Sequence, residues 1–146
     1  MKNNNIVCPV DFVTVNEYKI RVIAFLVFTL SIIFIVTDYW IIAAFMCADF
    51  FLRAFVNGKL SVLSYAANYI LAKTLLGNKP VDRAPKKFAA QIGFALTLFI
   101  SISSVINYNY SSFIGVIILI IFSSLESFIG FCAGCYIYHF YQKIIK

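Results

Sequence analysis

Four long apolar stretches make up most of the chain, and short polar segments separate them. They cover residues 20–37, 39–56, 88–106 and 112–138. A helix needs about 20 apolar residues to cross the hydrocarbon core of a bilayer, so each stretch predicts a transmembrane helix. The connectors TDYW and NYNYS are short and polar, which favours a helical hairpin on either side of the middle of the chain. We therefore predict an all-α fold of four transmembrane helices in two hairpins, forming one membrane domain over residues 1–146.

The connection between the two hairpins, residues 57–87, contains a predicted helix of its own. Its positions at helical spacing are Leu63, Ala67, Ile70 and Thr74. The breakers that follow are Gly77, Pro80 and Pro85. Two placements fit this pattern: an amphipathic helix lying along the cytoplasmic face of the membrane, or a short helix packed under the bundle without lipid contact.

Composition restricts the class of protein. Hydrophobic residues make up 62% of the chain, charged residues only 12%, and the mean hydropathy is +0.92. So few polar groups cannot cover a water-soluble surface, which indicates an integral membrane protein in contact with the lipid bilayer. The first eighteen residues are polar or mixed, and no small-residue cleavage site follows the first apolar run, so we expect no removable signal peptide.

Basic residues are distributed unevenly along the chain, whose net charge is +6. Lys19 and Arg21 precede the first stretch, and Lys143 and Lys146 lie in the tail. Seven more lie at the end of the second stretch or in the connection: Arg53, Lys59, Lys73, Lys79, Arg83, Lys86 and Lys87. Because the two opposite turns contain neither Lys nor Arg, the positive-inside rule predicts a multi-pass protein of the cell membrane with both termini and the connection in the cytoplasm. This distribution does not favour a nucleic-acid partner.

Three segments carry a family resemblance: DFFLRAFVNGKLS, APKKFAAQIGFALTLF and LESFIGFCAGCYIY. From the first span to its end, the chain resembles a small bacterial membrane family known as domain of unknown function 4395. The most specific element is the tail motif of Glu126, Phe131, Cys132, Gly134 and Cys135. The resemblance implies a four-helix membrane protein with a shared thiol pair and supplies no established activity. Members commonly carry Asn-Pro where this chain has Asn57 and Gly58, a departure that affects only the expected helix stop.

On a single helix, the tail motif divides into two faces. Glu126, Gly130 and Gly134 recur at every fourth position, and the two glycines have the G-x-x-x-G spacing that lets membrane helices pack closely. The opposite face carries Phe128, Cys132, Cys135 and His139. Close packing and thiol chemistry can therefore occur on different faces of the same predicted helix.

Three charged residues are predicted to form a buried cluster. A carboxylate facing lipid is costly, so Glu126 should face a neighbouring helix. Asp49 and Arg53 are four residues apart and can pair along their own helix, and one of them should be the ionisable group nearest to Glu126. Two interpretations stay open: an acid and base cluster that relays protons or binds an ion, or a charge-paired clamp between the two hairpins.

Cys132 and Cys135 are candidate catalytic residues, because cysteines at this spacing can form a disulfide or bind a metal together. Their predicted position near a helix C-terminus argues against an activated thiolate, and buried cysteines also pack as small hydrophobic residues. Cys8 lies on the same predicted side and could act as a resolving thiol. Cys135 and His139 could share a metal with Cys132 and Cys8, but an interfacial histidine is the simpler interpretation, so we predict no metal site.

Two functional hypotheses follow. The first is thiol redox chemistry or sulfur transfer through a cytoplasm-facing C-x-x-C, with a soluble thiol or sulfur-carrier protein as partner. The second is a non-enzymatic membrane module, such as a small transporter subunit or an assembly partner, with structural cysteines. Four short spans are few for a transporter, which makes a homo-oligomer a candidate assembly. The sequence identifies no cofactor, and it contains no phosphate-binding loop, dinucleotide fingerprint or zinc-protease helix.

Overall fold

The structure, a computed structural model, describes residues 14–56, 60–75, 77, 79–130 and 133–145. Strand β1 (Thr14–Asn16) precedes helices α1 (Glu17–Thr37), α2 (Trp40–Phe55) and α3 (Val62–Thr74). Strand β2 (Pro80–Asp82) leads into α4 (Arg83–Val105) and α5 (Asn109–Ser124). A π-helical turn, η1 (Leu125–Ile129), extends α5, and the last helix is α6 (Ala133–Ile145). The chain is mostly helical, as the hydrophobic pattern predicts.

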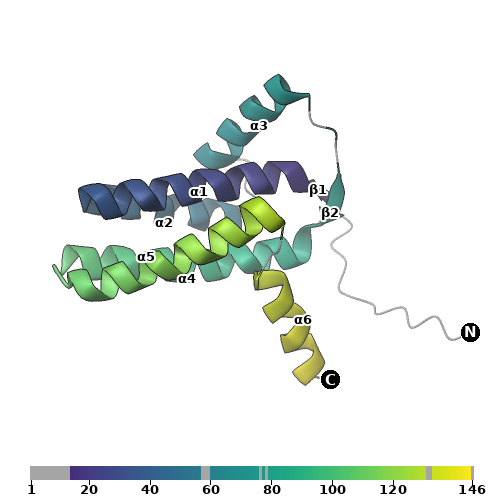
Figure 1. Ribbon diagram of the computed structural model, residues 1–146. Coiled ribbons are helices and arrows are strands. Elements are labelled where there is room, and N and C mark those ends of the chain that lie inside the picture. Colours follow the sequence, from purple (N-terminus) through teal and green to yellow (C-terminus); the bar gives the residue numbers. More distant parts are fainter. Residues whose placement is uncertain (1–13, 57–59, 76, 78, 131–132, 146) are drawn as a thin grey trace, which may run out of the picture.

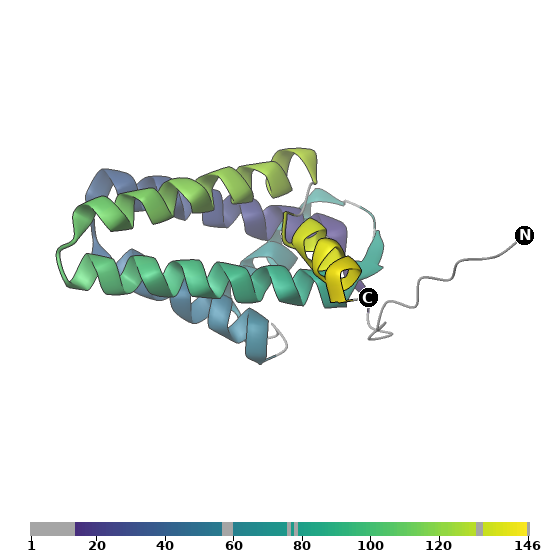
Figure 2. The same ribbon diagram turned by 90° about the horizontal axis from the view of Figure 1, so that it is seen from below.

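Helices α1, α2, α4 and α5 lie side by side and form a bundle (Figure 1). Helix α4 packs against α2 and α5, and α5 also packs against α1. The α1–α2 and α4–α5 turns lie at one end of the bundle, whereas the two strands, α3 and α6 lie at the other (Figure 1, Figure 2). The strands pair antiparallel with Val15 opposite Val81, a short ribbon that the sequence analysis missed.

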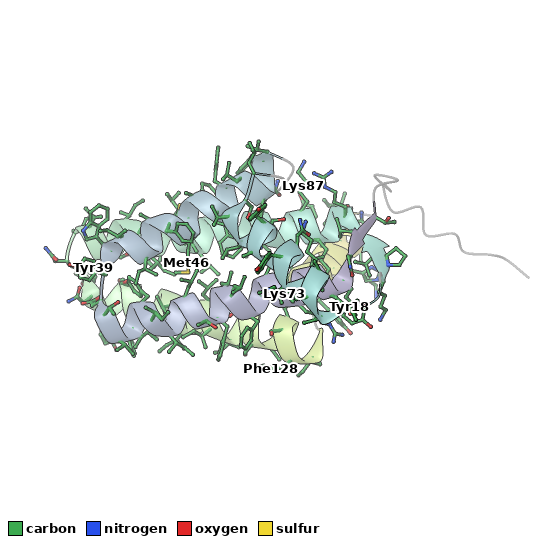
Figure 3. All side chains as sticks on the ribbon, turned by 90° about the horizontal axis from the view of Figure 1, so that it is seen from above. Tyr18, Tyr39, Met46, Lys73, Lys87 and Phe128 are labelled. Carbon is green, nitrogen blue, oxygen red and sulfur yellow. The ribbon has the colours of Figure 1, made fainter. Side chains whose placement is uncertain are left out.

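We call the end with the strands the basic end, because the Lys and Arg residues of the described part lie at or beyond it. They are Lys19, Arg21, Arg53, Lys73, Lys79, Arg83, Lys86, Lys87 and Lys143. Figure 3 shows the contrast between the two ends: the labelled Tyr18, Lys73 and Lys87 lie toward the basic end, and Tyr39 lies at the opposite turn. The basic residues that cluster in the sequence therefore also cluster at one end of the bundle.

The bundle exposes many large apolar side chains, and its interior contains several polar side chains beside an apolar core. Exposed residues along its helices include Phe25, Ile33, Phe45, Phe99, Ile102, Phe113, Ile117 and Ile121. Buried polar residues include Ser31, Thr97, Ser103, Ser112 and Ser123. The Ser31 and Thr97 hydroxyls donate to backbone carbonyls of their own helices, at 2.8 Å in each case. The outer surface of a soluble bundle is mostly polar, so this apolar surface indicates contact with lipid.

Small residues set the spacing between the bundle helices. A Cβ atom at Gly93 of α4 would lie 2.6 Å from Phe50 Cδ1 of α2, and one at Gly115 of α5 would lie 2.8 Å from Ile100 Cγ1 of α4. Met46 is fully buried, and its sulfur lies 3.9 Å from the Ser31 hydroxyl of α1 (Figure 3). Glycine at these two contacts therefore lets α4 pack closely against α2 and α5, as small residues do between membrane helices.

Three helical segments are long and apolar enough to cross a bilayer: Glu17–Thr37, Lys86–Val105 and Asn109–Ile129. They indicate a multi-pass membrane protein. Helix α2 has only 16 residues, a length of about 24 Å, compared with about 30 Å for a typical hydrocarbon core. Helix α2 is thus slightly shorter than the apolar stretch 39–56 that predicted the second span.

The predicted helix over residues 112–138 is wrong in its second half. The chain is helical from Asn109 to Ile129, and Gly130 then adopts a left-handed conformation with φ +72°. Its N–H donates to the carbonyl of Leu125, which closes the π-helical turn, and a new helix begins at Ala133. Glycine adopts positive φ without the steric cost that a Cβ imposes, so Gly130 ends the helix.

The helix expected in the central connection is present as α3. Ser61 caps its first turn by accepting a hydrogen bond from the Ser64 N–H at 3.2 Å. Leu63 and Ala67 are buried, and α3 packs against α1. Of the four positions at helical spacing, Ile70 and Thr74 are exposed, because the second half of α3 extends beyond the bundle.

Candidate functional site

Asp49 is a buried carboxylate in the last two turns of α2, with an exposed fraction of only 2%. Its Oδ1 accepts from the Ser61 hydroxyl at 2.6 Å and from the Leu63 N–H at 3.1 Å. Both donors belong to the first turn of α3, where backbone N–H groups lack partners within the helix. Asp49 therefore anchors the start of α3 to α2, and its negative charge also suits a helix N-terminus.

Arg53 lies one turn after Asp49 and is charge-paired with it. Its Nε lies 3.0 Å from Asp49 Oδ2, and its guanidinium lies 4.2 Å from the centre of the Phe50 ring. Nε contacts this carboxylate without hydrogen-bond geometry, and within the described part of the chain the buried Nη2 has no hydrogen-bond acceptor. The side chain is 17% exposed, so Arg53 is a nearly buried cation with an unused donor at Nη2.

Glu126 has a different partner from the one expected. It lies in η1 and accepts a hydrogen bond at 3.1 Å from Lys86 Nζ, in the first turn of α4. The sequence pattern favours Asp49 or Arg53 as the nearest ionisable group, and no sequence pattern links residues forty positions apart. Glu126 and Arg53 do line one cavity, so the three expected residues lie in the same region without forming a single ion cluster.

Gly130 and Gly134 do not share a helical stripe with Glu126, because η1 ends at Gly130. The Arg21 guanidinium of α1 occupies the position where a Cβ of Gly130 would lie. Arg21 in turn pairs with Glu17 at 2.9 Å, and Glu17 pairs with Lys79 at 2.9 Å. Gly130 thus permits a close contact with a basic side chain at the end of η1, and this is not the predicted helix–helix stripe. Gly134 lies in the first turn of α6.

The predicted thiol pair lies only partly within the described residues. Cys8 and Cys132 fall outside them, and Cys135 is described by its backbone, in the first turn of α6. The expectation that Cys135 lies near a helix C-terminus is wrong, because α6 runs from Ala133 to Ile145 and Cys135 is in its first turn. Cys47 is half-buried on α2, and His139 is exposed on α6. Among the residues described, no three His, Cys, Asp or Glu side chains converge as metal ligands.

A cavity of about 180 Å³ lies at the basic end, and we call it the basic cavity. Its charged lining residues are Lys19, Arg53, Arg83, Lys86, Lys87 and Glu126. They come from the start of α1, the end of α2, the start of α4 and η1, so the sequence alone did not bring them together. The only sequence feature that pointed to this site was the position of these residues at helix termini, next to the apolar stretches.

A smaller cavity of about 80 Å³ adjoins the basic cavity, and we call it the apolar cavity. The two share Phe50, Arg53 and Ala89 as lining residues. The remaining lining of the apolar cavity is almost entirely aliphatic or aromatic, with Val27, Leu96 and Leu119 as examples. The basic cavity and the apolar cavity thus meet at Arg53.

A comparison with protein families identifies the family of this chain. The family model described as domain of unknown function DUF4395 matches residues 15–143. The chain belongs to this family. No curated protein and no solved structure matches the chain. Membership of DUF4395 confirms the resemblance seen in the sequence, and the match extends from β1 to the last turns of α6.

Proposed function

We propose that this DUF4395 protein crosses the bilayer four times, with α2 as a short span and with both termini and residues 57–87 in the cytoplasm. The supporting observation is the charge distribution: no Lys or Arg occurs between Arg21 and Arg53 or between Lys87 and Lys143. A short span is accommodated by local thinning of the bilayer or by flanking side chains that reach the interface. Tyr39 and Trp40, which are exposed at one end of α2, are suited to this role.

Reporter fusions test the topology. A reporter fused after Asp38 or after Asn109 should be active outside the cytoplasm, and one fused after Lys87 should be active inside. The matched pair Asp38 and Lys87 brackets the short α2 span, because α2 must cross the membrane for the two reporters to differ. Reporters after Asp38 and Lys87 that report the same side would refute a crossing α2.

We propose further that Cys132 and Cys135 take part in thiol redox chemistry or sulfur transfer with a soluble thiol or sulfur-carrier protein. The observation in its favour is the start of α6 at Ala133, directly after Cys132 in the sequence. Thiolates are stabilised at helix N-termini, where the helix dipole is positive. For Cys135, the unfavourable dipole of a helix C-terminus therefore does not apply.

In the redox form of this chemistry, the dithiol reduces a disulfide of the partner protein. The thiolate of one cysteine attacks a partner sulfur and releases the other as a thiolate, which takes up a proton. The second cysteine thiolate then attacks the mixed disulfide and frees the partner. Two electrons and two protons pass to the partner, and Cys132 and Cys135 are left as a disulfide.

Alkylation kinetics of single-cysteine variants test the thiol proposal. Variants that keep only Cys132, only Cys135 or only Cys47 are treated with a maleimide at several pH values. Cys132 or Cys135 should react faster than the half-buried Cys47 and should retain its reactivity at lower pH. If both tail cysteines react no faster than Cys47, and replacing both by Ser changes no phenotype, the pair has a packing role.

A non-enzymatic membrane module is the second candidate, and the contacts of Asp49 favour it. Both of its oxygens are used by structural partners, Ser61 and Leu63 at one and Arg53 at the other. A carboxylate with these contacts holds α2 to α3, which supports a structural role for Asp49; the predicted clamp between the two hairpins is a separate contact. Retention of a redox cofactor by the purified protein would favour the thiol hypothesis over this one.

A further inference from the structure

The basic cavity contains two lysines whose charge no described acidic residue neutralises. Asp49 compensates Arg53, and Glu126 compensates Lys86. Lys19 and Lys87 are both half-buried and form no ion pair with any described residue. Like charges gathered in a partly buried site repel one another, so the cavity favours the entry of an anion.

Arg53 provides a donor for such an anion. Its Nε is taken by the contact with Asp49, but its buried Nη2 has no acceptor among the described residues, although an unsatisfied buried donor is costly. Arg53 lines both cavities and lies at their junction. An anionic oxygen placed there could accept a charge-assisted hydrogen bond, which phosphate and carboxylate groups form readily with guanidinium.

The position of the basic cavity fits a group at the level of the lipid headgroups. Helices α1 and α4 both begin at this end, so their N-terminal dipole ends add to the positive potential. Lys19 and Lys87 lie within the first turns of membrane-length segments, close to the boundary between apolar and polar sequence. Basic pockets between transmembrane helices at this level are typical binding sites for anionic headgroups.

The apolar cavity indicates that the anion is an amphiphile. It continues inward from the basic cavity past Arg53, Phe50 and Ala89 and is lined by side chains such as Val27 and Leu96. A free inorganic anion uses only the basic cavity, whereas a phospholipid can place its phosphate there and part of an acyl chain in the apolar cavity. The basic cavity, about 180 Å³, is below the range of about 300–1,000 Å³ for drug-sized ligands and suits a headgroup.

We propose that the basic cavity binds the phosphate of an anionic phospholipid, with Arg53, Lys19 and Lys87 as its cationic contacts and the apolar cavity accepting part of an acyl chain. Free inorganic phosphate would present the same phosphate group to these cations. The apolar cavity is the reason for assigning the lipid source. This site is independent of the proposed chemistry of Cys132 and Cys135.

Native mass spectrometry of the detergent-purified protein, titrated with phosphatidylglycerol, phosphatidylcholine or inorganic phosphate, tests the proposal. One phosphatidylglycerol should bind at least tenfold more tightly than phosphatidylcholine, with an affinity that falls as salt increases. Equal affinity for the two lipids would overturn the proposal without any variant being needed. Inorganic phosphate that binds at one site and excludes phosphatidylglycerol would overturn the lipid assignment.

The double variant Lys19→Gln with Lys87→Gln tests the location. Its affinity for phosphatidylglycerol should fall on the order of thirtyfold. The control is Lys73→Gln with Lys143→Gln, which removes the same charge from exposed residues outside the lining and should leave the affinity within about twofold. Equal losses in both double variants would show a nonspecific surface effect and overturn the site. If the first double variant loses its helical circular dichroism, Lys87→Gln alone, with an expected loss of about fivefold, replaces it.

Discussion

The Asp49–Arg53 pair offers the sharpest test of how the bundle is held together, through the substitution Asp49→Asn. Asparagine keeps an oxygen that can accept from Ser61 and Leu63, so the start of α3 keeps its anchor. What is lost is the negative charge that compensates Arg53 at 3.0 Å. The variant therefore isolates the ion pair from the hydrogen bonds to α3.

The expected cost follows from burial. Removing one partner of a buried ion pair costs about 3–5 kcal/mol, because the other charge is left uncompensated. Arg53 retains 17% exposure, so we expect the lower end, about 3 kcal/mol. The double variant Asp49→Asn with Arg53→Met removes both charges, and it should recover about 1–3 kcal/mol of that loss.

The assay is equilibrium unfolding of the purified protein in detergent, followed by helical circular dichroism. Asp38→Asn is the matched control, because Asp38 is exposed in the α1–α2 turn and its left-handed conformation, φ 51°, is one that Asn adopts readily. The control should stay within about 0.5 kcal/mol of the wild type. Equal stability of the two Asp→Asn variants, or a double variant no more stable than Asp49→Asn alone, would refute the reasoning.

Three further predictions use the same unfolding assay. Gly93→Ala should destabilise the protein by about 1–3 kcal/mol, because its Cβ would meet the Phe50 ring, whereas Gly77→Ala, with open space around it, should have little effect; equal effects would exclude a steric cause. Gly130→Ala should cost about 1–3 kcal/mol through its positive φ and its contact with a basic side chain, and an unchanged stability would contradict the helix end at this residue. Glu126→Gln should cost about 1–2 kcal/mol by removing the charge-assisted hydrogen bond from α4; an increase in stability would show that the ion pair carries no net benefit.

The parts of the fold that depend on local sequence were predictable. Apolar runs locate α1, α2 and α4 to within a few residues, because a long apolar stretch in a membrane chain has only one favourable conformation. The helix α3 followed from its spacing of apolar positions. The Asp49–Arg53 pair followed from helix geometry alone, since residues four apart lie on the same side of a helix.

The break at Gly130 was not predictable from hydropathy. A glycine within an apolar run has the same appearance whether it permits close helix packing or ends a helix at positive φ. Here η1 ends at Gly130 and α6 is a separate helix, so Glu126 and Cys135 do not lie on one helix. The predicted faces of the tail helix assumed one continuous helix and are therefore wrong. The same holds for the expectation that the helix dipole is unfavourable at Cys135.

The basic cavity was also beyond reach of the sequence, because it depends on contacts between distant segments. Lys86 meets Glu126 across forty positions, and Asp49 meets Leu63 across the connection between α2 and α3. Charge counting placed the basic residues on one side of a membrane. It did not indicate that several of them line a single space between helices.

A lipid bound in the basic cavity couples ligand binding to the stability of the bundle. Without lipid, Lys19 and Lys87 repel the other cations, so replacing both with Gln should stabilise the protein slightly. Phosphatidylglycerol at about 100 times its dissociation constant adds about 2.7 kcal/mol to the wild type. A site weakened thirtyfold gains only about 0.9 kcal/mol at the same concentration. The order of stability of wild type and variant should therefore reverse when the lipid is added, a result that a purely structural role for the two lysines does not produce.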